Sequence, residues 1–286
     1  MTKQFTWGEA VETTFQTRST WRNGAGSKPA RINCDHFTRH QGLSFPCDRI
    51  SIAVMEDVGL QLEEEGKSDA TINRVASAVA TALNHCARRG LCAKPPVFTK
   101  RKEDEVRLTI FTQSEVCRLI AAAKDPFGRD DIADLIAAAS YTGMRQGELL
   151  RIKKRDINLG TAQIHVGGRP DQRTKSRNYR CIPIHHNIQE MLTRRLAPLA
   201  DEDRVFGDDW SDKDQVLRAF RKVRKYAGFD DSLVFHSLRH SFATWHVEGG
   251  TNMRVLMTLM GHARVETTLR YAKGTDKAKT QAMSNI

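Results

Sequence analysis

The stretch from His236 to Tyr271 constrains the chain more than any other part of the sequence. His236 and Arg239 stand three residues apart, and residues three apart on a helix are neighbours on its surface. The apolar residues of the same segment recur at helical spacing, at Leu238, Phe242 and Trp245. The segment therefore predicts a helix from which the histidine and the arginine project on one face.

Two further short helices are expected in this stretch. Asn252 opens an apolar-periodic run that Gly261 ends, as a glycine at a helix C-terminus commonly does. His262 follows at the edge of that turn, and Tyr271 comes at the end of the third helix. A lone histidine or tyrosine usually only packs or caps. Two histidines, an arginine and a tyrosine gathered at helix edges suit the attack of a phenol on a phosphate.

The composition is that of an ordinary globular protein of two domains. The chain has 286 residues, of which 40% are apolar and 28% are charged. No apolar run approaches the roughly 20 residues that cross a bilayer. The first residues also lack the apolar core of a signal peptide, so a cytoplasmic protein without membrane contact is expected.

The charge balance favours a polyanionic partner. Lys and Arg number 45 against 34 Asp and Glu, a net charge of +11, and such an excess is most often used to bind nucleic acid. The alternative is charge that serves solubility alone. A local patch supports the first interpretation, because residues 151–180 hold nine basic residues and two acidic ones. The basic residues are Arg151, Lys153, Lys154, Arg155, Arg169, Arg173, Lys175, Arg177 and Arg180.

The six cysteines lack the paired spacing of a disulfide framework or a zinc ribbon. A zinc site is the alternative for four residues in the first third of the chain, Cys34, His36, His40 and Cys47. No C-x-x-C pair anchors it, so reduced and mostly buried thiols are expected instead. No cofactor and no metal ion are expected, since the candidate site segments hold no cluster of aspartates able to bind Mg²⁺.

The first part of the chain is predicted to be an all-helical domain over residues 1–92. Helical periodicity covers residues 8–21, 50–62 and 69–89, and a turn cluster occupies residues 23–29. Two adjacent prolines and a run of charges then indicate an interdomain linker over 93–110. A basic linker between two basic domains would let them close around a duplex.

The second domain is predicted over residues 111–286 and includes a small sheet. Helices are expected from Thr112 or Ser114 and over 130–140, 186–196 and 211–226. Gly143 permits a tight turn that puts Arg145 at the start of a new helix, with Glu148 one turn later. The period changes to two over residues 162–166, and a second strand over 179–184 is placed near an edge by its proline. The predicted fold class is mainly α with a small β-sheet (α+β).

Five segments together resemble the tyrosine recombinases, the phage integrase family. Residues 142–149, with Arg145 and Glu148, are similar to the family's first arginine box, and residues 174–184 to its β-turn lysine segment. His236-Ser-Leu-Arg239 and Met260-Gly-His262 are similar to the second and third boxes, with Tyr271 as the nucleophile. The resemblance is strong over 110–273. Over 1–100 only helical content and position agree, and no arm-type DNA-binding domain is evident.

The resemblance implies a fold and a set of roles. The helical N-terminal domain would be a core-binding domain that forms a C-shaped clamp around DNA with the catalytic domain. Arg145, Arg239 and His262 would hold the scissile phosphate, His236 would take the proton of the Tyr271 phenol, and Lys175 would be the general acid. Glu148 would orient an arginine or a histidine, with an exposed helix-surface carboxylate as the alternative. DNA-binding candidates from the basic patch are Lys153, Lys154, Arg155, Arg173 and Arg177.

The function implied is that of a site-specific DNA recombinase, an integrase that exchanges strands through a covalent 3′-phosphotyrosyl intermediate. Its expected partners are double-stranded DNA at specific recombination sites, three further copies of the chain in a homo-tetramer, and DNA-bending accessory proteins. A phage or another mobile element is the expected source. A type IB topoisomerase-like enzyme is one alternative, and a non-catalytic DNA-binding protein of the same fold is the other.

Overall fold

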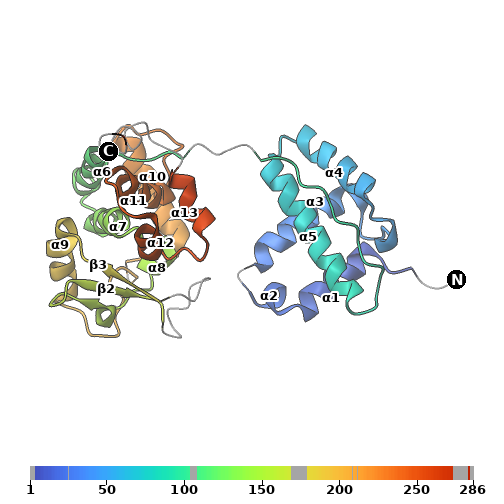
Figure 1. Cartoon of the computed structure of the whole chain (residues 1–286), viewed down its shortest axis with the longest axis horizontal. Helices are drawn as coiled ribbons and strands as arrows, with labels where there is room; N and C mark the ends of the chain where they lie inside the picture. The colour runs from blue at the N-terminus through green and yellow to red at the C-terminus, as the bar shows by residue number, and fades with distance from the viewer. Residues whose placement is uncertain are drawn as a thin grey trace. The chain divides into compact units, whose positions relative to one another are not determined.

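The computed structural model describes residues 4–24, 26–103, 108–168, 179–207, 209–210, 212–272 and 283. The chain divides into two compact units, Met1–Val106 and Arg107–Ile286, each with a hydrophobic core of its own (Figure 1). We call them the N-terminal and the C-terminal unit. The boundary lies inside the stretch 93–110 in which the sequence predicts a linker.

The regular elements in the described part of the N-terminal unit are all helices. Thr6 caps the first helix in a capping box, because its backbone N–H donates to Glu9 Oε2 at 2.9 Å while its hydroxyl accepts from the Glu9 N–H. The inward faces meet around large apolar side chains, among them Trp7 and Phe37, whose rings pack edge to face at 4.9 Å. The elements are α1 (Trp7–Thr17), α2 (Ser19–Arg22), α3 (Ser27–Gln41), η1 (Cys47–Arg49), α4 (Ile52–Glu64) and α5 (Asp69–Ala87).

Helix α3 was not predicted from the sequence, which places a turn cluster over 23–29 and no helix between that cluster and residue 50. Pro29 lies in the first turn of α3, where a missing N–H removes no helical hydrogen bond. The buried face of α3 consists of Ala30, Cys34 and Phe37. That face carries only one large apolar side chain, so its periodicity is weak although its spacing is helical.

The predicted zinc alternative finds no support in this unit. Among the residues that the structure describes, no three His, Cys, Asp or Glu side chains come together as metal ligands would. All six cysteines are free, and Cys34, Cys47 and Cys86 are buried. Burial raises the pKa of the Cys34 thiol to about 12, so this side chain is held as a protonated thiol.

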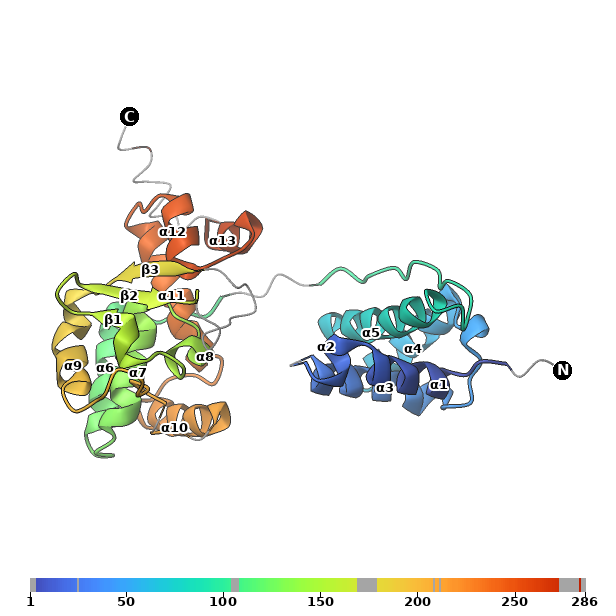
Figure 2. The ribbon, with the colours of Figure 1, turned by 90° about the horizontal axis from the view of Figure 1, so that it is seen from below.

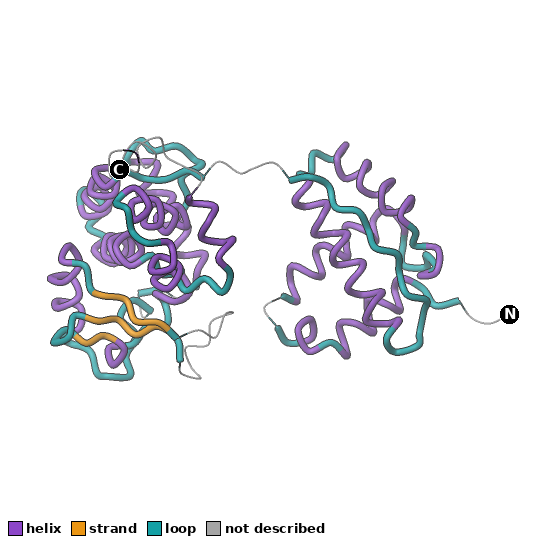
Figure 3. The backbone as a smooth tube through the Cα atoms, in the orientation of Figure 1, coloured by secondary structure: helices purple, strands orange, loops and turns teal. Residues whose placement is uncertain are grey.

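The loop after α5 is fastened to the N-terminal unit at least as far as Arg101. The Asn73 side chain donates to the Arg101 carbonyl at 3.0 Å and accepts from the Arg101 N–H at 2.9 Å. The Arg101 guanidinium also pairs with Glu63 and Asp69, at 2.7 and 3.2 Å. Figure 3 shows this loop in teal, running along the helices of the unit. The first residues of the predicted linker are therefore part of the N-terminal unit.

The C-terminal unit is built around α7 (Asp130–Thr142), in which ten of 13 residues are buried. Helices packed against it include α6 (Gln113–Lys124), which Thr112 caps, α9 (His186–Leu196), α10 (Lys213–Tyr226) and α11 (Phe235–Glu248). A helix buried on nearly all sides needs the small side chains that α7 supplies, four alanines among them. The predicted helices of this unit are therefore confirmed.

The sheet is small and antiparallel, with strand order β1-β2-β3. Its strands are β1 (Ile157–Asn158), β2 (Gln163–Val166) and β3 (Arg180–Pro183). In β3 the side chains alternate, so that Arg180 and Ile182 are buried while Pro183 is exposed. β3 lies at an edge of the sheet, as the proline predicted, and runs beside α12 (Met253–Met260) (Figure 2). The mainly helical α+β fold class is confirmed.

Helices α11, α12 and α13 (Val265–Ala272) form a small cluster of their own, in which Phe242, Leu256, Met260 and Tyr271 are buried together. Asn252 caps α12, and Gly261 ends it in the left-handed conformation with φ 63°. No helix in the described part of the chain combines the length and the apolar content that crossing a membrane requires.

Gly143, which ends α7, gives a test of the packing between α7 and α11. Its φ is 62°, and an added Cβ would meet the Phe242 ring at 2.4 Å. We expect Gly143→Ala to destabilise the protein by about 2–4 kcal/mol, from left-handed backbone strain and overpacking together. The measurement is the shift in the urea unfolding midpoint of the full chain.

Gly228→Ala is the matched control. Gly228 has φ 74°, but an added Cβ would meet nothing within 4 Å. It should therefore cost only the backbone strain, about 1–2 kcal/mol. Equal shifts for the two variants would contradict the close packing of Phe242 on Gly143.

Candidate active site

Arg145 sits where the sequence predicts, at the start of a short helix behind the Gly143 turn. It is the N-cap residue of α8 (Gln146–Leu149). Its backbone N–H donates to Glu148 Oε2 at 2.8 Å, and its Nη1 donates to Glu148 Oε1 at 3.1 Å. The Arg145 side chain is 39% exposed whereas that of Glu148 is 2% exposed. The alternative that Glu148 is an exposed helix-surface carboxylate is therefore wrong.

Arg239 comes from the middle of α11 and is almost completely buried. Its Nη1 donates to the Gly143 carbonyl and its Nη2 to the Met260 carbonyl, the latter at 2.6 Å. Burial, and then the nearby charge of Arg145, lower the pKa of the Arg239 guanidinium to about 9. A pKa of this size still leaves the side chain positively charged at pH 7.

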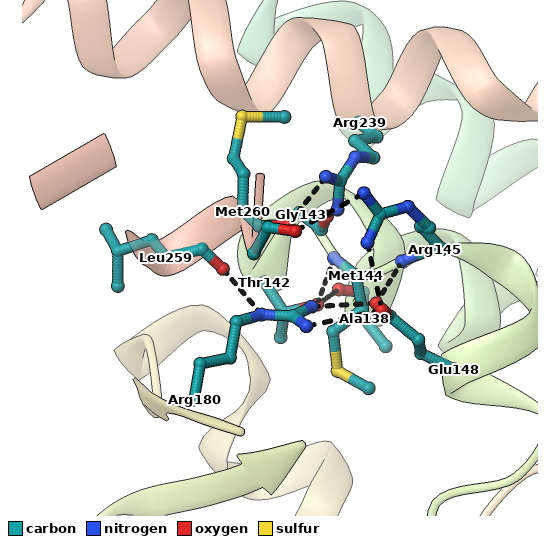
Figure 4. A network of polar contacts seen from close by, with 11 residues as sticks. Ala138, Thr142, Gly143, Met144, Arg145, Glu148, Arg180, Arg239, Leu259 and Met260 are labelled. Atoms are coloured by element: carbon teal, nitrogen blue, oxygen red, sulfur yellow. Dashed lines mark hydrogen bonds and ion pairs between the residues drawn. The ribbon is translucent and has the colours of Figure 1, made fainter. Parts of the chain in front are cut away.

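Three consecutive carbonyls at the end of α12 each accept from a different arginine. The Leu259 carbonyl accepts from Arg180 Nε at 2.8 Å, and the Met260 carbonyl accepts from Arg239. The next carbonyl, that of Gly261, is 3.5 Å from Arg145 Nη2. Figure 4 shows the Leu259 and Met260 carbonyls with their arginines. The last carbonyls of a helix lack helical partners and carry its partial negative charge, so they gather these guanidiniums. We call the three side chains the arginine cluster.

Arg180 and Glu148 form a buried ion pair next to Arg145. Arg180 Nη2 donates to Glu148 Oε2 at 2.7 Å and Nη1 to Oε1 at 3.2 Å, with both side chains 2% exposed. Burial alone would raise the pKa of the Glu148 carboxyl. The hydrogen bonds and charge of Arg180, with those of Arg145, outweigh it and lower the pKa to about 2. Glu148 is therefore ionised throughout the physiological range.

His262 and Tyr271 lie together beside the end of α12. The His262 side chain shares a 2.7 Å hydrogen bond with the Thr268 hydroxyl, which fixes its ring against α13. The Tyr271 ring lies parallel to it, with centroids 6.4 Å apart. Both side chains are 7% exposed. The nine residues from His262 to Tyr271 thus form a turn and the short helix α13, which brings the two rings side by side.

The Tyr271 hydroxyl shares a 2.8 Å hydrogen bond with His240 Nδ1. His240 in turn meets the ring of His236 edge to face, with centroids 4.7 Å apart. Arg239 stands one residue before His240 on α11, so the Tyr271 phenol is held against the helix that also supplies Arg239. The structure thus brings the phenol, two histidines and the guanidiniums of one chain into the same region.

Some predicted residues lie elsewhere or outside the described ranges. Lys175, Arg173 and Arg177 lie outside the described residues. The other three DNA-binding candidates are engaged within the C-terminal unit. Lys153 and Arg155 pair with Glu202, and Lys154 donates to the Leu199 carbonyl. Glu202 is 62% exposed, and such surface pairs contribute at most about 1 kcal/mol, so a polyanion can displace them. Their binding to DNA stays a prediction.

Two residues of the site were not predicted from the sequence. Arg180 was placed in the basic patch and in the β-turn lysine segment but was given no role, although its alternation with Ile182 places it on the buried face of a strand. His240 received no role, although it stands four residues after His236 and therefore on the same helical face. Both patterns can be recognised in the sequence. Neither shows that Arg180 pairs with Glu148 or that His240 bonds to Tyr271.

Helical catalytic units of this kind, with a small sheet, occur in solved structures of integrases. The Tn1549 transposon integrase in complex with a circular intermediate DNA superposes with a TM-score of 0.75 at 17% identity, over 99% of this chain and 100% of that one. A lambda integrase tetramer bound to a Holliday junction gives 0.73 at 18% identity, over 96% and 79%. These similarities show a shared fold.

Sequence comparison leads from that fold to the family. The chain is 26% identical to tyrosine recombinase XerD of Oceanobacillus iheyensis over 250 residues, 82% of each protein. It is 32% identical to tyrosine recombinase XerC of Rhodospirillum centenum over 227 residues, 72% of this chain and 63% of that protein. The sequence model of the phage integrase family matches residues 109–278, which hold every site residue described above. The chain belongs to the phage integrase family and is an enzyme of the tyrosine recombinase class.

The depressed pKa of Glu148 predicts a pH-dependent contribution to stability. Its folded pKa of about 2 lies below the ordinary 4.5, so the stabilisation is present above pH 4.5 and is lost as the pH falls toward 2. The shift corresponds to about 3 kcal/mol. We expect the difference in unfolding free energy between the wild type and Glu148→Gln to shrink by more than half between pH 6 and pH 3. Urea unfolding across that range measures it.

Glu190→Gln, a change at an exposed carboxylate of α9, is the control and should show no such trend. A constant difference for Glu148→Gln over the whole range would show that the Arg180 pair does not depress this pKa.

Proposed function

We propose that the protein is a site-specific DNA recombinase that cleaves and rejoins DNA through a covalent 3′-phosphotyrosyl bond to Tyr271. The observation that carries this is the hydrogen bond of the Tyr271 phenol to His240, on the helix that also carries His236 and Arg239. Family membership and the net charge of +11 support double-stranded DNA as the substrate. The two units would then form a clamp around the duplex.

Charge stabilisation is the task proposed for Arg145, Arg239 and His262. When the phenol oxygen bonds to phosphorus, negative charge grows on the non-bridging phosphate oxygens. Forked guanidiniums that are charged at pH 7 stabilise this charge without rearranging, because their hydrogen bonds to the ends of α7 and α12 already fix them. Partly exposed Arg145 would make the first contact with the phosphate, and Arg239 would hold the deeper side.

Proton transfer completes the step. As the new O–P bond forms, the phenol proton leaves to His236, and His240, which shares a hydrogen bond with the phenol, packs against that histidine. The bond from phosphorus to the 5′-oxygen breaks, and Lys175 protonates this oxygen as general acid. The product is a phosphotyrosyl link and a free 5′-hydroxyl. A 5′-hydroxyl from a partner duplex reverses the step, which exchanges the strands without an external energy source.

The proposed assembly and biological role rest on the strand-exchange reaction and on the similar proteins. Exchange of both strand pairs needs four active sites, so a tetramer on two recombination sites is proposed, as in the lambda integrase structure on a Holliday junction. Integration or excision of a phage or another mobile element is the proposed role, with the Tn1549 integrase as structural support. Chromosomal site resolution is the second candidate, since relatives named XerC and XerD share 26–32% identity with this chain.

Tyr271→Phe tests the chemistry. The variant lacks the attacking oxygen but keeps the aromatic ring in the α11–α13 cluster. On a duplex nicked near the cleavage site, the wild type should form a covalent protein–DNA adduct, and the variant should form none while binding DNA within about threefold of the wild type. Denaturing gel electrophoresis measures the adduct. Adduct formation by the variant would exclude Tyr271 as nucleophile, and adduct without exchange between two sites would favour the topoisomerase alternative.

A mixing experiment tests whether the tyrosine acts within its own protomer. The hydrogen bond of Tyr271 to His240, the residue after Arg239 on α11, favours attack on a phosphate held by the same chain. Tyr271→Phe and Arg239→Ala variants mixed in equal amounts should therefore form adduct at less than about 1% of the wild-type rate, as each does alone. Recovery to a substantial fraction of the wild-type rate in the mixture would show that the tyrosine acts in trans.

A further inference from the structure

Arg180 differs from the other two members of the arginine cluster because all three of its guanidinium nitrogens donate within the protein, two to Glu148 and one to the Leu259 carbonyl. It is the first residue of β3, and its side chain is 2% exposed, whereas that of Arg145 is 39% exposed. A buried guanidinium whose three nitrogens already donate within the protein is not placed to bind a DNA phosphate directly. Its effect on the reaction must therefore pass through the groups that it contacts.

The first of these groups is Glu148, which two arginines share. Oε1 accepts from Arg145 Nη1 and Arg180 Nη1, and Oε2 accepts from the Arg145 backbone N–H and Arg180 Nη2. With Arg180 present, Glu148 and Arg180 form a neutral pair, and the charge of Arg145 is left over. Without Arg180, the buried carboxylate would neutralise Arg145 instead. Arg180 thus decides whether Arg145 presents a net positive charge.

The second group is the turn that ends α12. Arg180 Nε donates to the Leu259 carbonyl at 2.8 Å, and a Cβ added to Gly261 would come within 2.8 Å of Arg180 Nη1. The turn therefore rests directly on the Arg180 guanidinium. His262 is the next residue along the chain, and the Met260 carbonyl between these contacts holds Arg239. The same guanidinium sets the position of this turn relative to Glu148 and Arg145.

We propose that Arg180 is a positioning residue of the strand-transfer reaction. It neutralises Glu148, so that Arg145 keeps its charge for the scissile phosphate, and it supports the α12 turn that places His262 and Arg239. This inference rests on the proposed function, because it concerns the stabilisation of charge on that phosphate.

The test compares Arg180→Gln with the double variant Glu148→Gln/Arg180→Gln. Adduct formation is followed in a single turnover at saturating protein, on the nicked duplex, and DNA affinity is measured separately. Arg180→Gln should lower the rate by about 100-fold, the usual loss for one charge-stabilising donor, with DNA affinity within about threefold of the wild type. The double variant removes both buried charges, so it should be at least about tenfold faster than Arg180→Gln.

The adduct rate of the double variant distinguishes a role of Arg180 in charge balance from a role in folding alone. A role in stability alone predicts that a second change to the site slows the enzyme further or leaves it equally slow. The double variant buries no unpaired charge and should fold even if Arg180→Gln does not. A folded double variant at or below about 1% of the wild-type rate would overturn the proposal, as would Arg180→Gln cleaving within about threefold of the wild type.

Arg180→Lys tests the two contacts separately. It keeps the charge, but one ammonium cannot span both Glu148 oxygens and the Leu259 carbonyl. Its rate should lie between those of the wild type and Arg180→Gln. A rate equal to that of the wild type would overturn the support of the α12 turn, and a rate equal to that of Arg180→Gln would overturn the neutralisation of Glu148.

Arg195→Gln is the matched control. Arg195 pairs with the buried Asp134 at 2.7 Å, between α9 and α7, away from the arginine cluster. Its loss should lower the melting temperature and leave the adduct rate of the folded protein within about twofold of the wild type. If the wild type itself forms no adduct, the proposed function fails. If the wild type forms adduct and the double variant shows no recovery, only the role of Arg180 fails.

Discussion

The carbonyl end of α12 is the constraint on which the rest of the site depends. A helix end buried without partners is costly, and here its last three carbonyls face guanidiniums from a strand and two other helices (Figure 4). Three arginines that would otherwise repel one another are held close by these carbonyls and by one buried carboxylate, Glu148. The result is a fixed cationic site whose donors need little rearrangement when an anion enters.

The reactive side chains are arranged locally, in contrast to the arginines. His236, His240, His262 and Tyr271 all belong to the α11–α13 segment and its turns. Short helices folded on a small shared core bring the phenol against His240 and parallel to His262. The nucleophile therefore comes from one short part of the chain, α11–α13. The arginine cluster, in contrast, combines residues from distant parts of the C-terminal unit.

Most of the fold was predictable because its periodicities are strong. Helix α9 has the bounds that the sequence predicts, and the Gly143 and Gly261 turns fall where glycine was expected to end a helix. Helix α3 escaped prediction because its buried face has one large side chain and its first turn contains Pro29. The surface alternative for Glu148 failed for a related reason. The residues next to Glu148 in the sequence suggest an exposed carboxylate. Its burial is possible only because Arg180, 32 residues away, pairs with it.

The sequence by itself determined the chemical groups, the local helices that present them and the family to which the chain belongs. Only the tertiary structure decided which groups are partners. Arg145, Arg180 and Arg239 reach carbonyls 116, 79 and 96 residues away in the chain. Helical and strand periodicities describe neighbours within a few residues, so they carry no information about such contacts. The pairing of Arg180 with Glu148, and of Tyr271 with His240, follows from how the elements pack and from the need of buried polar groups to find partners.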